Sequence, residues 1–250
     1  ASYDQPLAVS TIVDFLQDDS TELNKIALAH LALDNGHLVT DEINQLLIKK
    51  LTALVAEKHK VAIALELIAV AENSNHPKVK ALLAEHKAKL ETKDIVAQFA
   101  NSLEGGDAKE GKKIVLDKAA VQCTRCHKVG ANGSKVGPEL THIAYQHSAT
   151  YLLEALVDPS AKIAPGYGTY TITMKSGENI TGIFFGETET TLTLGKNVDK
   201  QITYQKSDIA NIEKAVSGMP PMNYLLTAEE IRDVIAFLLT LNSKPVVKGH

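Results

Sequence analysis

The first hundred residues carry apolar side chains at intervals of three and four positions. Because an α-helix has 3.6 residues per turn, this spacing places the apolar residues of each segment on one face and predicts amphipathic helices. The predicted starts and stops are Asp19 with Glu22, Asn35-Gly36, Thr40-Asp41 and the segment from Asn73 to Pro77. We expect about five or six helices here, stacked as antiparallel pairs.

Between residues 167 and 214 the apolar pattern changes to alternation, which is the period of a β-strand. The predicted strands are 170–174, 179–185, 191–194, 201–204 and 208–212. Short strands in so small a segment predict a strongly bent antiparallel barrel that resembles an SH3 or Sm-type barrel. Sm proteins bind RNA, but this segment lacks their basic character. We therefore interpret it as a structural or docking insert.

The helical period returns on both sides of this insert. A helix over 109–119 is predicted behind a capping box at Asp107 and Glu110, and another helix is predicted over 149–157. The last helix follows a capping box at Thr227 and Glu230. The fold class that follows is mainly α and multidomain. Its predicted parts are a helical domain over 1–103, a second helical domain over 104–166 and 215–243, the β insert over 167–214 and a tail over 244–250.

Composition and charge argue against several classes of binding partner. The chain has 250 residues with a formal net charge of −4, and it has no basic block. Nucleic acid and anionic membranes are therefore unfavourable partners. The longest nearly apolar run, from Val61 to Ala71, is far shorter than the ~20 residues that a membrane helix needs. Trp is absent, which argues against an aromatic sugar groove.

The two cysteines are the strongest chemical signal. They read Cys123-Thr124-Arg125-Cys126-His127, which is the C-x-x-C-H signature of covalent c-type haem attachment. Two thiols at this spacing reach the two vinyl groups on one edge of the porphyrin, and the adjacent imidazole reaches the iron. A disulfide would leave the histidine unexplained, a thioredoxin-type pair would follow a strand, and zinc would need a second ligand pair.

Haem attachment also indicates a compartment. Bacteria attach haem c outside the cytoplasm, so we expect a periplasmic or otherwise exported protein. The sequence shows no signal peptide, which predicts a mature form or a cut piece of a longer protein.

Several short motifs resemble those of a class I cytochrome c. They are Gly111, Cys123 to His127, Gly137-Pro138-x-Leu140, Tyr151 to Glu154 with Asp158-Pro159, a Met-Pro pair and Ile235 to Leu238. More narrowly, residues 104–243 resemble the haem-binding domain of planctomycete-type membrane-bound or sugar dehydrogenases. That family has a run similar to Asp158 to Ile163, a β insert and a Met-Pro-Pro segment. The first hundred residues loosely resemble a HEAT-type solenoid.

The resemblance implies roles for individual residues. Cys123 and Cys126 would hold the porphyrin, and His127 would be the proximal iron ligand. The backbone carbonyl of Pro138 would accept the other imidazole N–H, which fixes the ring. We favour Met219, which precedes a proline as the family pattern requires, as the distal ligand.

Other distal ligands stay open. Met222 is the nearest substitute, because a flexible thioether on a loop could replace Met219. His142 and His147 are rivals that would give a His–His haem, whereas Met174 is expected in the core of the insert. Phe237 stands where the family usually has tyrosine. The remaining histidines are expected to be solvated or to cap helices: His30, His37, His59, His76 and His86.

The resemblance implies a periplasmic mono-haem c-type cytochrome that accepts electrons from a dehydrogenase and passes them to another cytochrome or a terminal oxidase. No general base or nucleophile stands beside the motif, so we expect an electron carrier rather than an enzyme. The alternative is a haem enzyme or a gas- or peroxide-binding sensor with a labile distal ligand, assisted by Arg125 or His142. A third hypothesis makes the helical segment and the insert docking modules for a redox partner.

Overall fold

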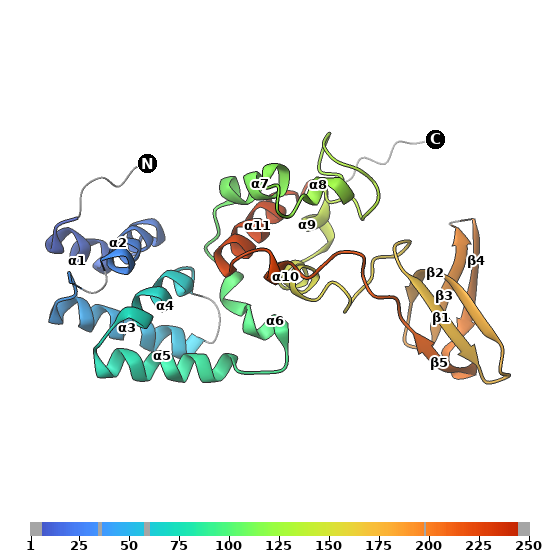
Figure 1. Cartoon of the computed structure of the whole chain (residues 1–250), viewed down its shortest axis with the longest axis horizontal. Coiled ribbons are helices and arrows are strands. Elements are labelled where there is room, and N and C mark those ends of the chain that lie inside the picture. Colours follow the sequence, from blue (N-terminus) through green and yellow to red (C-terminus); the bar gives the residue numbers. More distant parts are fainter. Residues whose placement is uncertain (1–6, 35–36, 58–60, 198, 245–250) are drawn as a thin grey trace. The chain divides into compact units, whose positions relative to one another are not determined.

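The computed structural model describes residues 7–34, 37–57, 61–197 and 199–244 (Figure 1). The predicted stop at Asn35-Gly36, His59 and residues 245–250 of the predicted tail lie outside this part. The chain separates into two compact units, one formed by Ala1–Ile114 with Leu226–Thr240 and the other by Val115–Leu225 with Leu241–His250. The sequence instead groups the last helix with the haem motif, and those domain boundaries stay a prediction.

Among the described residues, five helices form the first part of the first unit (Figure 1). They are α1 (Val9–Gln17), α2 (Thr21–Leu33), α3 (Asp41–Glu57), α4 (Ala64–Asn73) and α5 (Pro77–Leu90). Helix α3 packs against α1 and α5, and α2 packs against α1 and α4. Each of the five helices packs against at least two of the others. Their stacking as antiparallel pairs stays a prediction. A HEAT-like relationship stays a prediction.

Local signals at the ends of these helices differ slightly from the expectation. Ser20, rather than Asp19, caps α2, because its hydroxyl accepts the backbone N–H of Leu23. His76 caps α5 as expected. His86 was expected to be solvated or to cap a helix, but it is only 1% exposed and its Nε2 lies 3.0 Å from the amide nitrogen of Asn101.

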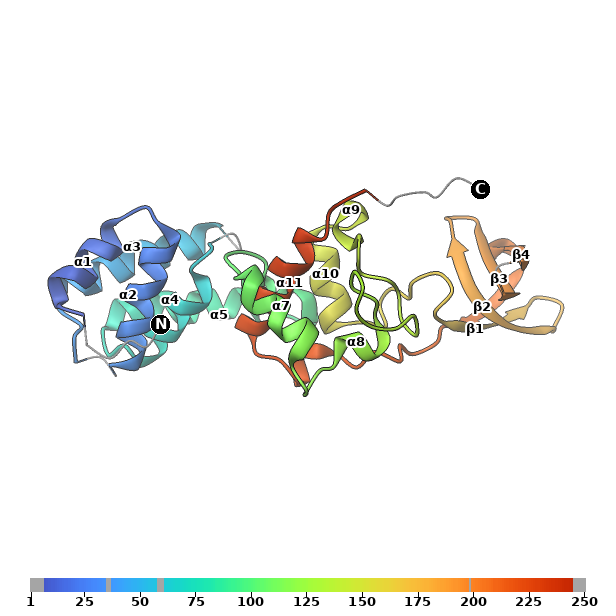
Figure 2. The same ribbon diagram turned by 90° about the horizontal axis from the view of Figure 1, so that it is seen from above.

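The rest of the first unit contains α6 (Ile95–Gln98), the 3-10 helix η1 (Ala100–Ser102), most of α7 (Ala108–Asp117) and α11 (Ala228–Thr240). The capping box before α11 is confirmed, because Thr227 and Glu230 each accept the other's backbone N–H. Helices α7 and α11 meet closely at Gly111 (Figure 2). A Cβ on Gly111 would overlap the Asp233 carbonyl oxygen and lie 3.0 Å from Phe237 Cβ.

The second unit carries the cysteine motif on α8 (Cys123–Cys126), followed by α9 (Ile143–Gln146), α10 (Ala149–Val157) and the 3-10 helix η3 (Met222–Tyr224). Helix α10 has the predicted bounds. It buries Leu152, Leu153, Leu156 and Val157 and packs against η3.

The insert forms one antiparallel sheet in the order β4-β3-β2-β1-β5 (Figure 1). Its strands are β1 (Thr169–Met174), β2 (Asn179–Glu187), β3 (Thr191–Asn197), β4 (Lys200–Gln205) and β5 (Ile209–Glu213). One face buries Tyr170, Ile172, Phe184 and Leu192 among others, and Ile163 from the segment before the sheet joins this core. All five predicted strands are present, and Met174 packs against the core as expected.

The predicted closure into a barrel is wrong. Within the described residues the sheet is open, since β4 and β5 are its two edges and are not paired with each other. At the open edge formed by β4, Ile202 is therefore 59% exposed, and Tyr204 is the one side chain of this strand that packs against the core. The whole is a mixed multidomain fold in which helices predominate.

Candidate haem-binding site

The two cysteines lie on the single helical turn of α8. Gln122, just before this turn, has a φ of 45°, a left-handed conformation that is uncommon outside glycine. The turn closes when the backbone N–H of His127 donates to the carbonyl of Cys123 over 2.9 Å. Both thiols are free, with Cys123 half-buried and Cys126 exposed. Burial raises the pKa of the Cys123 thiol. The turn therefore presents two uncrosslinked thiols three residues apart.

The imidazole of His127 is held by the loop that follows. Its Nδ1 lies 2.8 Å from the carbonyl oxygen of Pro138. Since a carbonyl only accepts, Nδ1 carries the proton and Nε2 keeps its lone pair for a metal. The structure thus brings together the residues that the resemblance names as proximal ligand and its orienting partner.

Backbone hydrogen bonds fold this loop back onto the cysteine turn. The N–H of Gly137 donates to the Cys126 carbonyl over 2.7 Å, and that of Leu140 donates to the Lys128 carbonyl over 2.8 Å. A Cβ on Gly137 would lie 2.8 Å from Cε1 and 3.0 Å from Nδ1 of His127. The sequence shows the Gly-Pro pair but assigns no role to its glycine. The structure shows that Gly137 lets the backbone lie against the imidazole.

We therefore expect Gly137→Ala to displace the His127 ring and to destabilise the haem-loaded protein by about 1–3 kcal/mol, the usual cost of overpacking. Covalent haem per chain and urea unfolding of the loaded protein would measure the effect. Gly186→Ala is the matched control, because a Cβ there meets nothing within 4 Å. Equal losses in both variants would contradict a role for Gly137.

The candidate distal ligands have different surroundings. Met222 is 4% exposed in η3 and belongs to the packing against α10. Met219 is half-buried in the loop before η3. His142 Nδ1 lies 2.9 Å from the carbonyl oxygen of Ser243, and the His147 ring stacks on Tyr151 with ring centres 3.8 Å apart. Burial also lowers the pKa of His147.

The donor set fits haem better than a bare metal ion. Among the described residues there is no cluster of three or more His, Cys, Asp or Glu side chains that could hold a metal. A porphyrin brings its own four nitrogens and needs from the protein only axial ligands. One oriented imidazole with a free Nε2, beside two free thiols at attachment spacing, meets that need.

Comparison with known proteins agrees with this geometry. The family model for cytochrome c matches residues 108–190, which run from the start of α7 past α8 and α10 into the sheet. No curated protein matches the chain. The match ends before Met219 and so leaves the distal ligand untested. Three findings agree: the attachment turn, the oriented imidazole and this family match. The chain contains a cytochrome c domain whose cofactor is covalently bound haem c.

Proposed function

We propose that this protein is an exported, periplasmic mono-haem electron carrier in which His127 and Met219 are the axial ligands. A dehydrogenase is its electron donor, and another cytochrome or a terminal oxidase is its acceptor. The observation that supports this most is the hydrogen bond of His127 Nδ1 to the Pro138 carbonyl beside the cysteine turn. Among the described residues no helix has the length and apolar character to span a membrane.

Each residue of the site has its own role in holding the haem. Bound haem supplies a one-electron iron couple. Cys123 and Cys126 fix the porphyrin edge, and Pro138 holds the imidazole of His127 in one orientation and strengthens it as a donor. Met219 would be the second iron ligand, and ligation by methionine would raise the reduction potential. A haem held by both His127 and Met219 would gain and lose an electron with little rearrangement.

A haem enzyme or sensor has less support. It would need a polar group free to act beside an open iron. The Arg125 guanidinium instead bonds the Gln122 side chain over 2.9 Å, and His142 bonds Ser243. Fast binding of carbon monoxide to the reduced wild-type protein would overturn the electron-carrier proposal and favour a gas sensor.

The direct test is the absorption spectrum of Met219→Ala. We expect complete loss of the methionine-to-iron charge-transfer band, and a fall in reduction potential on the order of 100 mV, because axial ligands set haem potentials over a wide range. The measurements are oxidised and reduced spectra and a potentiometric titration.

Met222→Ala is the matched control for this test. Because Met222 is buried in the packing of η3, its loss should cost about 2–5 kcal/mol of stability but leave the band in place. A band that survives Met219→Ala and vanishes in Met222→Ala would reverse the assignment. A low-spin spectrum unchanged in both variants would point to His142 or His147.

A further inference from the structure

The loop that carries Met219 is tied at two points, one on α10 and one in the turn just after it. Downstream, η3 begins at Met222 and packs against α10. Upstream, the backbone N–H of Ser217 donates to the hydroxyl of Ser160, over 3.1 Å and across 57 residues of sequence. Ser160 lies just after the end of α10. Met219 therefore lies between an anchor on α10 and an anchor just beyond the C-terminal end of that helix.

A second hydrogen bond connects Ser217, the upstream anchor, to Met219. The hydroxyl of Ser217 accepts the backbone N–H of Met219 over 3.1 Å. This bond spans two residues and sets only the local turn. The bond to Ser160 is the long-range one, and it sets where that turn lies relative to α10. After Met219, Pro220 and Pro221 restrict the backbone further.

We propose that Ser160 and Ser217 are positioning residues that hold the thioether of Met219 at the haem iron. This proposal rests on the proposed ligation by Met219 and adds to it the residues that keep the ligand in place. Without the Ser160 hydroxyl the loop keeps its anchor at η3 but loses its long-range bond upstream of Met219. Without the Ser217 hydroxyl the long-range bond stays, but the local bond that couples this anchor to the Met219 backbone is lost. The thioether then leaves the iron more often, and an added ligand can take its place.

Imidazole binding to the oxidised, haem-loaded protein tests this. An external ligand binds in proportion to the fraction of molecules with an open iron, so its apparent affinity reports that fraction. We expect Ser160→Ala and Ser217→Ala each to raise the apparent affinity about fivefold, the factor that one ordinary hydrogen bond gives. Ser217→Thr, which keeps the hydroxyl, should restore the wild-type affinity.

Two further variants make the result decisive. Ser207→Ala removes a serine hydroxyl that bonds Asp208 near the sheet edge and should leave imidazole binding unchanged. Adding Ser217→Ala to Met219→Ala should change nothing beyond Met219→Ala alone, because the serine acts through the methionine. If Ser217→Ala raised the apparent imidazole affinity about as much in the Met219→Ala background as it does alone, the serine would act by loosening the protein in general. That result would overturn the proposal.

The same measurements distinguish failure of the proposed Met219 ligation from failure of the positioning role. If Met219→Ala leaves imidazole affinity and the charge-transfer band as in the wild type, Met219 is not the ligand and both proposals fall. If Met219→Ala opens the iron but neither serine variant does, the ligation stands and the positioning role is wrong.

Discussion

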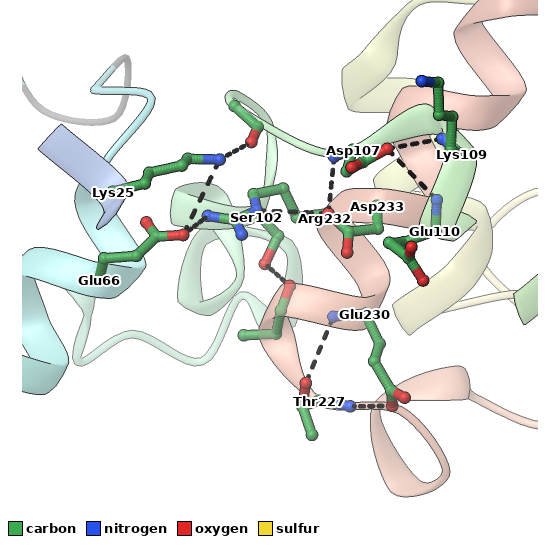
Figure 3. Close-up of polar contacts among 12 residues, drawn as sticks. Lys25, Glu66, Ser102, Asp107, Lys109, Glu110, Thr227, Glu230, Arg232 and Asp233 are labelled. Atoms are coloured by element: carbon green, nitrogen blue, oxygen red, sulfur yellow. Dashed lines mark hydrogen bonds and ion pairs between the residues drawn. The ribbon is translucent and has the colours of Figure 1, made fainter. Parts of the chain in front are cut away.

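Replacing Arg232 with alanine is expected to cost about 3 kcal/mol of the free energy of unfolding, the lower end for breaking a buried ion pair. Arg232 is 7% exposed in α11, and its guanidinium lies 2.8 Å from the carboxylate of Glu66 in α4 (Figure 3). Lys25 in α2 lies 3.8 Å from the same carboxylate, so Glu66 keeps a partner in the variant. Urea unfolding of the full, haem-loaded chain measures the loss.

Two comparisons separate this effect from ordinary surface charge. Lys87→Ala breaks the pair between Lys87 and Glu72, which is half exposed, and should cost no more than about 1 kcal/mol. Replacing both buried partners, as Arg232→Met with Glu66→Leu, should recover part of the lost stability because neither member of the pair is then left buried alone. The recovery is partial because Lys25 loses Glu66 and Asp233 loses Arg232. A cost for Arg232→Ala as small as that for Lys87→Ala would show that the pair is not important for stability.

Gly111→Ala is expected to be at least as damaging, with a loss of about 3 kcal/mol or more. Overpacking usually costs about 1–3 kcal/mol, and here the added methyl meets backbone rather than a flexible side chain. It would overlap the Asp233 carbonyl oxygen, so α7 and α11 could not keep their distance. Urea unfolding and near-UV circular dichroism of the loaded protein measure the change.

The neighbouring Lys112 supplies the control for that substitution. It is exposed on the same helix, so Lys112→Ala removes a side chain without touching α11 and should be nearly neutral. If Gly111→Ala unfolds at the same urea concentration as Lys112→Ala, the close approach of the two helices does not limit stability.

Both expectations concern how earlier segments of the chain pack against the last helix. Besides the pair with Glu66, the hydroxyl of Ser102 donates to the Ala228 carbonyl over 2.8 Å (Figure 3). A Cβ on Gly106 would overlap the Arg232 carbonyl oxygen, so the backbone approaches α11 closely there. The helical segment and α11 thus share one packing unit. A chain lacking residues 1–103 would lose Glu66, the partner of Arg232, so we expect the truncation to lower the stability of α11.

Local signals in the sequence predict local structure well. The bounds of α10, the capping box at Thr227 and the five strands follow from periodicity and capping over a few residues. The haem motif is equally local, because its five residues are contiguous. Only the resemblance to cytochrome c, and not any spacing, suggested the bond between His127 and Pro138.

Long-range pairings could not be predicted. Nothing near Arg232 in the sequence indicates Glu66 as its partner, and nothing near Ser217 indicates Ser160. The closure of the sheet was wrongly predicted because strand number and length do not reveal whether the two edge strands, β4 and β5, pair with each other. These features depend on which segments meet after folding, and a single sequence does not state that.

The bond between Ser217 and Ser160 also has a consequence for how this chain can change over evolutionary time. It brings together the two ends of the segment from 161 to 216, which contains the whole sheet. When the ends of an insertion already meet, lengthening, shortening or exchanging it alters the loop-closure entropy by only a small amount. We therefore expect changes in the length or sequence of the sheet to be tolerated while the fold of the surrounding residues stays the same.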